Sequence, residues 1–395
     1  MSKLRLAIIN THPIQYYAPI WRTLAQMPEL EVHVFYGSDF SVRGYTDSGF
    51  GVTFKWDMPL TEGYAHTFLS RDEKIQGLKG LRPIGLRQHL QRFKPDCVLI
   101  TACLPFFWIE TLWTVRRLRV PVVLRTESSD LEMGEERSFM KDCVRTLFYN
   151  SFYMQCAICL AVGGVSREHY LDKGVRTDRI GWSPSCVDTP HFERQVSRYE
   201  PARISLRQTF GFSETDLVLL FSGKLISIKD PLTLARALQS LPESLRRRVG
   251  LIVVGDGRLR PDFEAACRSA LGDKVVMAGF VNQSEIGRYY TAADCLVLPS
   301  LGEAWGLVVN EALQFGLPVI VSDRVACAPD LVVEGQTGLV FPAGDAQMLS
   351  MCISRMRDLL AGQGHSTIVE RCRQHIAQYS LAEAAEGIRR AVSSL

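Results

Sequence analysis

Short apolar runs alternate with longer amphipathic segments along most of this 395-residue chain, and this alternation constrains the fold more than any other feature. Continuous Val/Ile/Leu runs are typical of strands buried on both faces of a parallel sheet, with helices between them. In the first half, the pattern predicts strands over Leu4–Ile9, Val32–Tyr36, Cys97–Ile100, Pro121–Leu124 and Ala157–Val162. It predicts helices over Tyr17–Gln26, Ile84–Arg92, Phe106–Arg117 and Glu135–Phe152. In the second half, the pattern predicts strands over Leu217–Phe221, Gly250–Val254, Lys274–Ala278, Cys295–Leu298 and Pro318–Val321. It predicts helices over Pro231–Gln239, Leu259–Leu271, Ser284–Thr291 and Gly306–Phe315.

The alternation therefore indicates an α/β protein with two Rossmann-like doubly wound domains. It pauses at Ser183–His191, a stretch with two prolines that we interpret as the linker. We expect a first domain over residues 1–185, a second over 186–370, and a C-terminal helix within 371–395 that can pack back on the first domain. Two such domains face a cleft, and ligands of these sheets bind beyond the carboxyl ends of the strands.

Composition narrows the function classes. The net charge is +3 and basic residues are interspersed with acidic ones, so we expect no nucleic-acid partner. Eleven cysteines with scattered spacing do not resemble a secreted disulfide framework, and the N-terminus lacks the pattern of a signal peptide. No apolar stretch has the length of a membrane span. We expect a cytoplasmic protein.

Two lysines follow the strand expected at Leu217–Phe221. Lys224 and Lys229 leave the strand end together, and Pro231 stands where a helix can begin. Ammonium groups converging near a helix N-terminus suit a diphosphate. Two solvated surface lysines are the alternative. The nearby Gly255 and Gly257 are interpreted mainly as a tight strand-to-helix turn, because a third glycine of a dinucleotide motif is missing.

The loop after Cys295–Leu298 carries the strongest pattern. Glu303 lies in this loop, Gly306 is expected to open a helix, and Glu311 falls about a turn and a half inside it. Backbone N–H groups at the helix start can bind phosphate, Glu311 can accept from both hydroxyls of a ribose, and Glu303 can reach a sugar. These residues match a nucleotide diphospho-sugar. A helix cap at Glu303 and a surface position for Glu311 are the alternative.

Residues 180–345 resemble the retaining glycosyltransferases of family 4, which have the two-domain glycosyltransferase-B fold. The resemblance rests on Glu303 and Glu311 with seven residues between them, and on flanking motifs such as Gly223-Lys-Leu, Val254-Gly-Asp-Gly257 and Gly316-x-Pro318-Val. It implies that Gly223, Lys224 and Lys229 bind the donor diphosphate, that the loop of Phe280 and Val281 holds the base, and that Glu311 binds the ribose. It also implies that Glu303 and the backbone of Trp305, Gly306, Leu307 and Val308 hold the sugar and phosphate.

Two positions depart from the family pattern. Lys224 stands where many members have arginine, which replaces a bidentate phosphate contact by a point charge. Ala304-Trp305 replaces the common Gly-Phe, and we expect this change to reshape the sugar pocket.

Two loops of the first half are weaker candidates. The opening His12-Pro-Ile-Gln15-Tyr resembles one subgroup of the same family, and His12 or Gln15 is expected to contact phosphate or acceptor, with a turn or cap role as the alternative. Glu127 stands where many members place a histidine, close to Arg125 and Asp130. Either carboxylate can orient the acceptor hydroxyl, and a structural Arg–Glu pair is the alternative.

The resulting prediction is a glycosyltransferase, with Glu303, Glu127 and His12 as catalytic candidates and Gln15 among the donor-binding residues. The donor is a UDP- or GDP-sugar, the acceptor a sugar, a lipid-linked molecule or a small hydroxyl compound, and no cofactor is expected. The chain lacks an Asp-x-Asp motif, so we expect no metal, and the resemblance implies retention with attack from the leaving group's side. A nucleotide-sugar epimerase and a non-catalytic nucleotide-sugar-binding partner are the rival functions, and an NAD-dependent oxidoreductase is a weaker one. The basic aromatic segment 137–153 favours core packing, with peripheral contact at the inner membrane face as the alternative.

Overall fold

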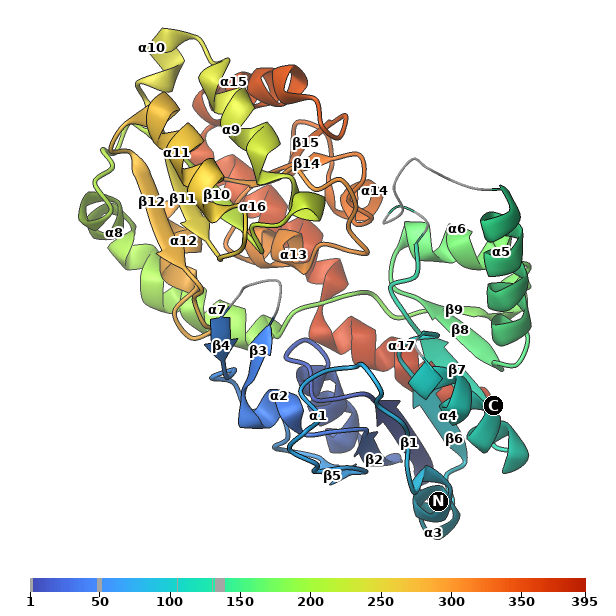
Figure 1. The fold of residues 1–395 in the computed structure, drawn as a ribbon. Coiled ribbons are helices and arrows are strands. Elements are labelled where there is room, and N and C mark those ends of the chain that lie inside the picture. Colours follow the sequence, from blue (N-terminus) through green and yellow to red (C-terminus); the bar gives the residue numbers. More distant parts are fainter. Residues whose placement is uncertain (1–2, 48–51, 105, 130, 132–138) are drawn as a thin grey trace.

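A computed structural model describes residues 3–47, 52–104, 106–129, 131 and 139–395, and it consists of two α/β domains, each built on a parallel sheet (Figure 1). The sheet of the first domain has the order β5-β2-β1-β6-β7-β8-β9. Its strands are β1 (Leu4–Asn10), β2 (Leu30–Tyr36), β5 (Ala65–Phe68), β6 (Cys97–Ile100), β7 (Val122–Arg125), β8 (Ile158–Ala161) and β9 (Ile180–Trp182). Its helices are α1 (Ala18–Gln26), α2 (Phe40–Arg43), α3 (Leu86–Phe93), α4 (Phe106–Arg117), α5 (Phe139–Tyr153) and α6 (Gly164–Asp172).

The sheet of the second domain has the order β12-β11-β10-β13-β14-β15. Its strands are β10 (Leu217–Ser222), β11 (Val249–Val254), β12 (Val275–Gly279), β13 (Cys295–Leu298), β14 (Val319–Ser322) and β15 (Gly338–Phe341). Its helices are α7 (Thr189–Tyr199), α8 (Arg203–Thr209), α9 (Pro231–Gln239), α10 (Glu243–Arg246), α11 (Arg260–Leu271), α12 (Gly287–Ala292), α13 (Leu307–Gln314), α14 (Ala328–Leu331), α15 (Ala346–Gln363) and α16 (His365–Ile376). The predicted fold class is therefore confirmed.

Each sheet is buried on both faces, which is why its strands are continuous apolar runs. In β1, Leu6 and Ile8 pack against α1, whereas Ala7 and Ile9 pack toward α3 and α4 on the opposite face. In the second domain one core lies beneath α9, α11 and α15 and the other beneath α12, α13 and α16. Helices on both faces leave the loops at the carboxyl ends of the strands to form the site.

The first half of the chain contains four strands that were not predicted from the sequence. The strands β5 and β9 lie at the two edges of the first sheet, are short, and carry partly exposed residues, so neither has a buried apolar run. A small antiparallel hairpin, β3 (Tyr45–Asp47) and β4 (Val52–Phe54), stands apart from this sheet. In the second half, β15 was not predicted as a strand.

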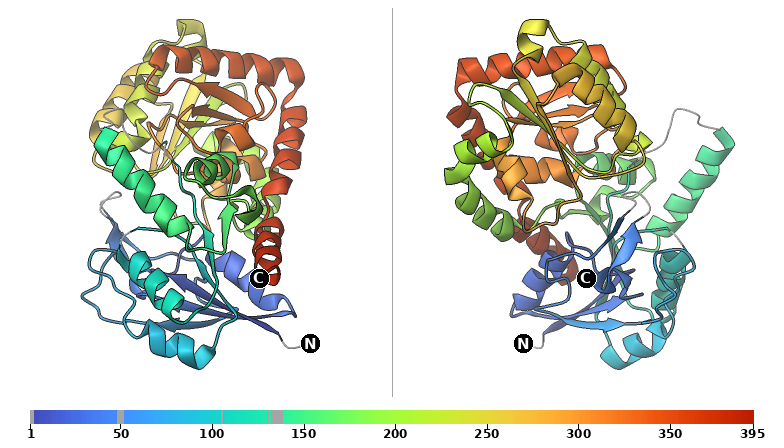
Figure 2. Two further views of the ribbon diagram at one scale, coloured as in Figure 1. Left: turned by 90° about the vertical axis from the view of Figure 1, so that its right-hand side faces the viewer. Right: turned by 60° about the vertical axis from the view of Figure 1, so that its left-hand side comes forward.

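The C-terminal segment is two helices, where the sequence predicted a single helical stretch from about residue 370. The helix α16 stays on the second domain, and the chain then turns before α17 (Leu381–Ser393), whose N-terminus is capped by the Ser380 side chain. Ala384, Ile388 and Val392 of α17 are buried with Trp21 of α1 in the first domain. The second view in Figure 2 shows α17, in dark red, lying against the blue first domain. The chain thus crosses back between its domains.

Core packing, the favoured interpretation of segment 137–153, holds for only one side of the helix α5. Phe148 and Phe152 pack into the first domain, but Met140, Val144 and Leu147 are 76%, 68% and 70% exposed. These three residues follow the i, i+4, i+7 spacing of one helical face. The predicted segment begins at Arg137, which lies outside the described residues.

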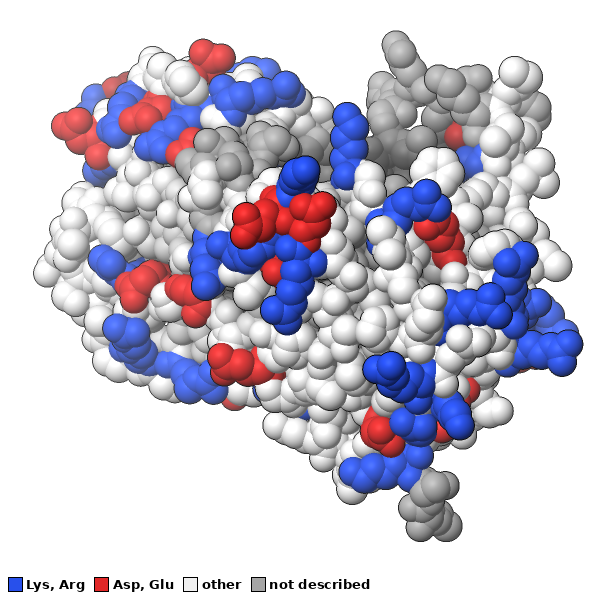
Figure 3. Space-filling view, turned by 60° about the horizontal axis from the view of Figure 1, so that its bottom comes forward, with Lys and Arg blue, Asp and Glu red and all other residues white. Residues whose placement is uncertain are grey.

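Charged side chains are mixed on the face seen in Figure 3, where basic and acidic groups lie side by side in several clusters. On α17, for example, Glu386 pairs with both Arg389 and Arg390. Within the described ranges, no helix combines the length and the apolar character needed to cross a membrane.

Candidate active site

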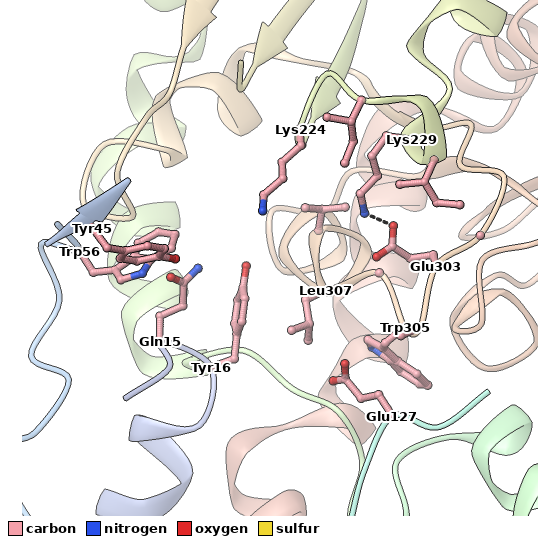
Figure 4. Close-up of a pocket in the computed structure, with 17 residues that line it drawn as sticks. Gln15, Tyr16, Tyr45, Trp56, Glu127, Lys224, Lys229, Glu303, Trp305 and Leu307 are labelled. Atoms are coloured by element: carbon pink, nitrogen blue, oxygen red, sulfur yellow. Dashed lines mark hydrogen bonds and ion pairs between the residues drawn. The ribbon is translucent and has the colours of Figure 1, made fainter. Parts of the chain in front are cut away.

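A cavity of about 660 Å³ lies between the two domains. We call it the main cavity, and Figure 4 shows it with its lining side chains. The first domain contributes Gln15, Tyr16, Tyr45, Trp56 and Glu127. The second contributes Gly223, Lys224, Ile226, Ile228, Lys229, Gly302, Glu303, Ala304, Trp305, Gly306, Leu307 and Val308.

A smaller hollow of about 90 Å³, the side cavity, shares with the main cavity the lining residues Gln15, Tyr16, Trp56, Gly223 and Val308. It is also lined by Phe280, Val281, Gln283 and Glu311. Of the thirteen site residues named from the sequence, twelve thus line one of two adjoining cavities. His12 is not among their lining residues in the described chain.

The loop after β10 brings both lysines to the main cavity. It lies close against the loop after β11, where Gly255 and Gly257 have φ values of +131° and +156°. A Cβ atom on Gly255 would lie 1.9 Å from the carbonyl oxygen of Gly223, so a side chain there would displace the lysine loop. Gly255 and Gly257 are therefore required for the close approach of the two loops, and Gly255 also lines the side cavity.

Lys229 and Glu303 lie side by side at the second-domain wall of the main cavity and form the ion pair marked by the dashed line in Figure 4. Ser300 Oγ also donates to Glu303 Oε2, at 3.3 Å. The sequence assigned the lysine to phosphate and the glutamate to sugar. In the structure the two side chains are in contact, so the two proposed subsites are neighbours. In the free protein, the positive charge of Lys229 and the negative charge of Glu303 neutralise one another.

The helix α13 begins directly at the cavity. Gly306 has a φ of +100°, the left-handed region in which glycine is favoured, and the helix starts at Leu307. The backbone N–H groups of a first helical turn lack partners within the helix and carry the positive end of its dipole. Together with Lys224 and Lys229, this helix start makes the cavity wall attractive to an anion.

The Trp305 side chain lines the main cavity and also has a structural position. Its ring is 2% exposed, and its Nε1 donates to Asn310 Oδ1 at 2.8 Å. Asn310 Nδ2 in turn donates to the Ser185 carbonyl oxygen in the linker, at 3.0 Å. A Cβ atom on Gly163 would lie 2.1 Å from the indole ring. Trp305 therefore docks the site loop against the first domain.

Glu311 is 1% exposed and far from a surface position. Its Oε2 accepts from Tyr290 Oη at 2.7 Å, and its Oε1 accepts from Tyr16 Oη at 3.1 Å and from Gln283 Nε2 at 3.4 Å. Burial raises the pKa of Glu311 above its usual range, and the three hydrogen bonds oppose this rise. The surface alternative is thereby wrong for this residue.

Glu127 lines the main cavity and accepts from Ser185 Oγ at 2.8 Å. Arg125, its expected structural partner, is buried and donates to Ser183 Oγ at 2.8 Å and to the Pro184 carbonyl oxygen at 2.7 Å. Arg125 therefore anchors the linker. The neighbouring Asp130 lies outside the described residues.

His12 packs against Phe40 with ring centroids 4.5 Å apart and the rings tilted by 31°, and its Nδ1 lies 3.0 Å from Thr11 Oγ1. Burial lowers the pKa of His12 to about 4, so the ring is neutral at pH 7 and adds no positive charge for a phosphate. The position agrees with the turn alternative better than with a contact to ligand.

Sequence reasoning missed the aromatic residues that the first domain brings to the site. Tyr16 was read only as part of a motif, and Tyr45 and Trp56 were not singled out. Both lie on or next to the unpredicted β3–β4 hairpin. Tyr16 directly follows the candidate Gln15, and this position next to a predicted site residue is the signal that could have identified it.

Comparison with solved structures identifies the class of fold. The fold matches solved glycosyltransferase structures over nearly the whole chain. Anabaena HepE in complex with UDP aligns with a TM-score of 0.71 and 17% identity, covering 99% of this chain and 100% of HepE. This likeness shows the two-domain glycosyltransferase-B fold.

Residues 202–365, within the second domain, match the family described as "Glycosyl transferases group 1". An uncharacterized glycosyltransferase of Methanocaldococcus jannaschii is 28% identical over 52% of this chain and 52% of its own length. The D-inositol 3-phosphate glycosyltransferase of Xylanimonas cellulosilytica is 34% identical over 38% of this chain and 36% of its own length. The matches span about half or less of these curated relatives.

Proposed function

We propose that this chain is a family 4 retaining glycosyltransferase that transfers a sugar from a nucleotide diphospho-sugar to a hydroxyl acceptor. The main cavity carries this proposal, because it combines two lysines, the start of α13 and Glu303 between two domains. The group 1 match of the second domain supports it. A HepE structure with UDP-glucose, of the same fold, supports UDP as the nucleotide.

We propose that the donor lies along the two cavities, with its base at one end and its sugar at the other. Phe280 and Val281 would hold the base in the side cavity, Glu311 the ribose, and Lys224 with the start of α13 the diphosphate. Glu303 and Glu127 would then face the transferred sugar and the acceptor in the main cavity.

In the proposed reaction the bond between the anomeric carbon and the donor phosphate oxygen breaks, and the acceptor oxygen bonds to the same face of that carbon. The acceptor proton passes to a phosphate oxygen of the leaving nucleoside diphosphate. Lys224, Lys229 and the dipole of α13 stabilise the negative charge that develops there.

A panel of UDP-, GDP- and ADP-sugars, scored by thermal shift, tests donor binding, since a ligand that binds only the folded state raises its stability. Release of nucleoside diphosphate is then measured with and without sugar acceptors. Acceptor-dependent release is expected. Conversion of the donor sugar without acceptor would instead identify an epimerase, and binding without turnover a non-catalytic partner.

We also propose that a lipid-linked acceptor is met at a membrane surface through the exposed apolar face of α5, at the outer edge of the first domain (Figure 2). Beside the end of this helix, Arg116 and Arg119 line one hollow together with Met154, and these cations suit anionic headgroups. Sedimentation with anionic vesicles tests this contact, with the triple variant Met140→Ser/Val144→Ser/Leu147→Ser as comparison. Equal sedimentation of both proteins would exclude it.

A further inference from the structure

Tyr16 forms a hydrogen bond that crosses from the first domain to the second. It lies between β1 and α1, and its hydroxyl donates to Glu311 on α13 at 3.1 Å. The other two donors to Glu311, Tyr290 and Gln283, belong to the second domain. Tyr16 is thus the donor whose position depends on how the domains sit together.

Both carboxylate oxygens of Glu311 are already occupied in the free protein. A ribose hydroxyl that binds Glu311 must therefore replace one of the three donors or share an oxygen with it. Tyr290 is fully buried beneath α13, whereas Tyr16 lines both cavities. Tyr16 is the donor that a ligand can reach and displace.

The space around Glu311 is small while Tyr16 stays in place. The side cavity measures about 90 Å³, which is room for a few water molecules. First-domain residues also close its rim. Asn282 Nδ2 donates to the Lys55 carbonyl oxygen at 3.0 Å, and the Trp56 ring lies 5.9 Å from Phe280.

We infer that Tyr16 substitutes for a ribose hydroxyl in the free protein, and that its hydroxyl leaves Glu311 when the nucleoside binds. The inference rests on the proposed function, because it requires Glu311 to be the ribose site. It adds a first-domain residue to donor recognition: Tyr16 keeps the buried carboxylate hydrogen-bonded until the ligand replaces it.

The test is the affinity of Tyr16→Phe for UDP, measured by calorimetry. This variant keeps the ring and removes only the competing hydroxyl. We expect the UDP dissociation constant to fall by about three- to tenfold, the equivalent of one net hydrogen bond. Tyr290→Phe is the matched control, and it should not tighten UDP, because Tyr290 supports Glu311 from within the second domain.

A ligand without ribose hydroxyls separates displacement from a general effect. For 2′,3′-dideoxy-UDP, Tyr16→Phe and the unaltered protein should bind alike. Unchanged or weaker UDP binding by Tyr16→Phe, or equal tightening of UDP and its dideoxy form, would overturn the inference while leaving the proposed function intact. If the unaltered protein binds none of UDP, GDP and ADP, the proposed function fails and the inference fails with it.

Discussion

The ion pair between Lys229 and Glu303 joins two residues that we propose as neighbouring donor contacts, so a bound donor must compete with this pair. A diphosphate that approaches Lys229 must draw its ammonium group away from Glu303, whereas Lys224 reaches the cavity from the opposite end of the same loop (Figure 4). The two lysines are therefore expected to contribute unequally, with part of the Lys229 contribution offset by the lost pair.

Replacing either lysine should weaken donor binding. Lys224→Ala and Lys229→Ala are each expected to raise the dissociation constant of the nucleoside diphosphate at least about tenfold, because a charge-assisted phosphate contact is lost. Titration calorimetry measures the change, and Lys94→Ala, an exposed lysine of the first domain, is the control. Unaltered binding in both cavity variants would refute the phosphate assignment.

The two glutamates should act on different kinetic constants. Glu311→Gln removes a contact to an unreacting part of the donor, so it should chiefly raise the donor Michaelis constant. Glu303→Gln should chiefly lower the turnover number, by about a hundredfold, if Glu303 faces the sugar whose charge changes. Both are measured in donor titrations at saturating acceptor. The reverse pattern would invert the assignment along the donor.

His12 should make stability depend on pH. Its pKa is about 4 when folded and about 6.5 when unfolded, so the unfolded chain binds the proton first as pH falls. Its contribution to the free energy of unfolding is present above pH 6.5 and is lost toward pH 4, by up to about 3 kcal/mol. Urea titrations at several pH values should show a smaller acid loss in His12→Gln. Identical pH profiles would argue against this burial.

At the scale of elements, the loop before α13 is held by the docking of Trp305 onto the start of α6. Gly163 leaves the space for the indole ring, and Asp330 of α14 accepts from the backbone N–H of Gly164 at 2.9 Å. A side chain at position 163 must push the ring and the site loop together. The packing of α6 is thereby coupled to the position of Glu303.

Gly163→Ala tests that coupling. Its Cβ would overlap Trp305, so we expect about 1–3 kcal/mol of destabilisation, visible as a lower Tm, together with weaker donor binding. Gly164→Ala is the matched control, because its Cβ would lie 3.5 Å from Asp330, an ordinary contact. Equal Tm values for the two variants would mean that the domains adjust freely at this contact.

At the scale of the whole molecule, the positive charges of the main cavity come from the second domain, and side chains of the first domain lie opposite them. The helix α17 crosses back and packs on α1, and Ser183 Oγ donates to the Ala384 carbonyl oxygen at 2.8 Å. The first domain is thus held by both the linker and the C-terminal helix. This double connection holds Tyr16, Trp56 and Glu127 opposite the second-domain wall of the main cavity.

Transfer should continue in excess chelator. Lys224, Lys229 and the start of α13 supply positive charge where the diphosphate would leave, and the chain has no Asp-x-Asp motif for a bridging ion. Nucleoside diphosphate release is measured with and without EDTA. Complete loss in EDTA, restored by magnesium or manganese, would reveal a metal site that this prediction omits.

Most central strands could be predicted, since strands buried on both faces are continuous apolar runs whatever the rest of the chain does. Cys97–Ile100 and Cys295–Leu298 agree with the structure to the residue. Edge strands such as β9 could not be predicted in the same way. They are short and half exposed, so pairing with a neighbour decides them more than their own pattern does.

The sequence by itself determined the fold class and the residues after β10 and β13, because local periodicity and glycine placement act over a few positions. Only the tertiary structure decided which groups meet. The hydrogen bond from Tyr16 to Glu311 joins residues 295 positions apart, and the pair of Lys229 with Glu303 joins residues 74 positions apart. Such contacts depend on how two independently folded sheets face each other, and no local pattern carries that information.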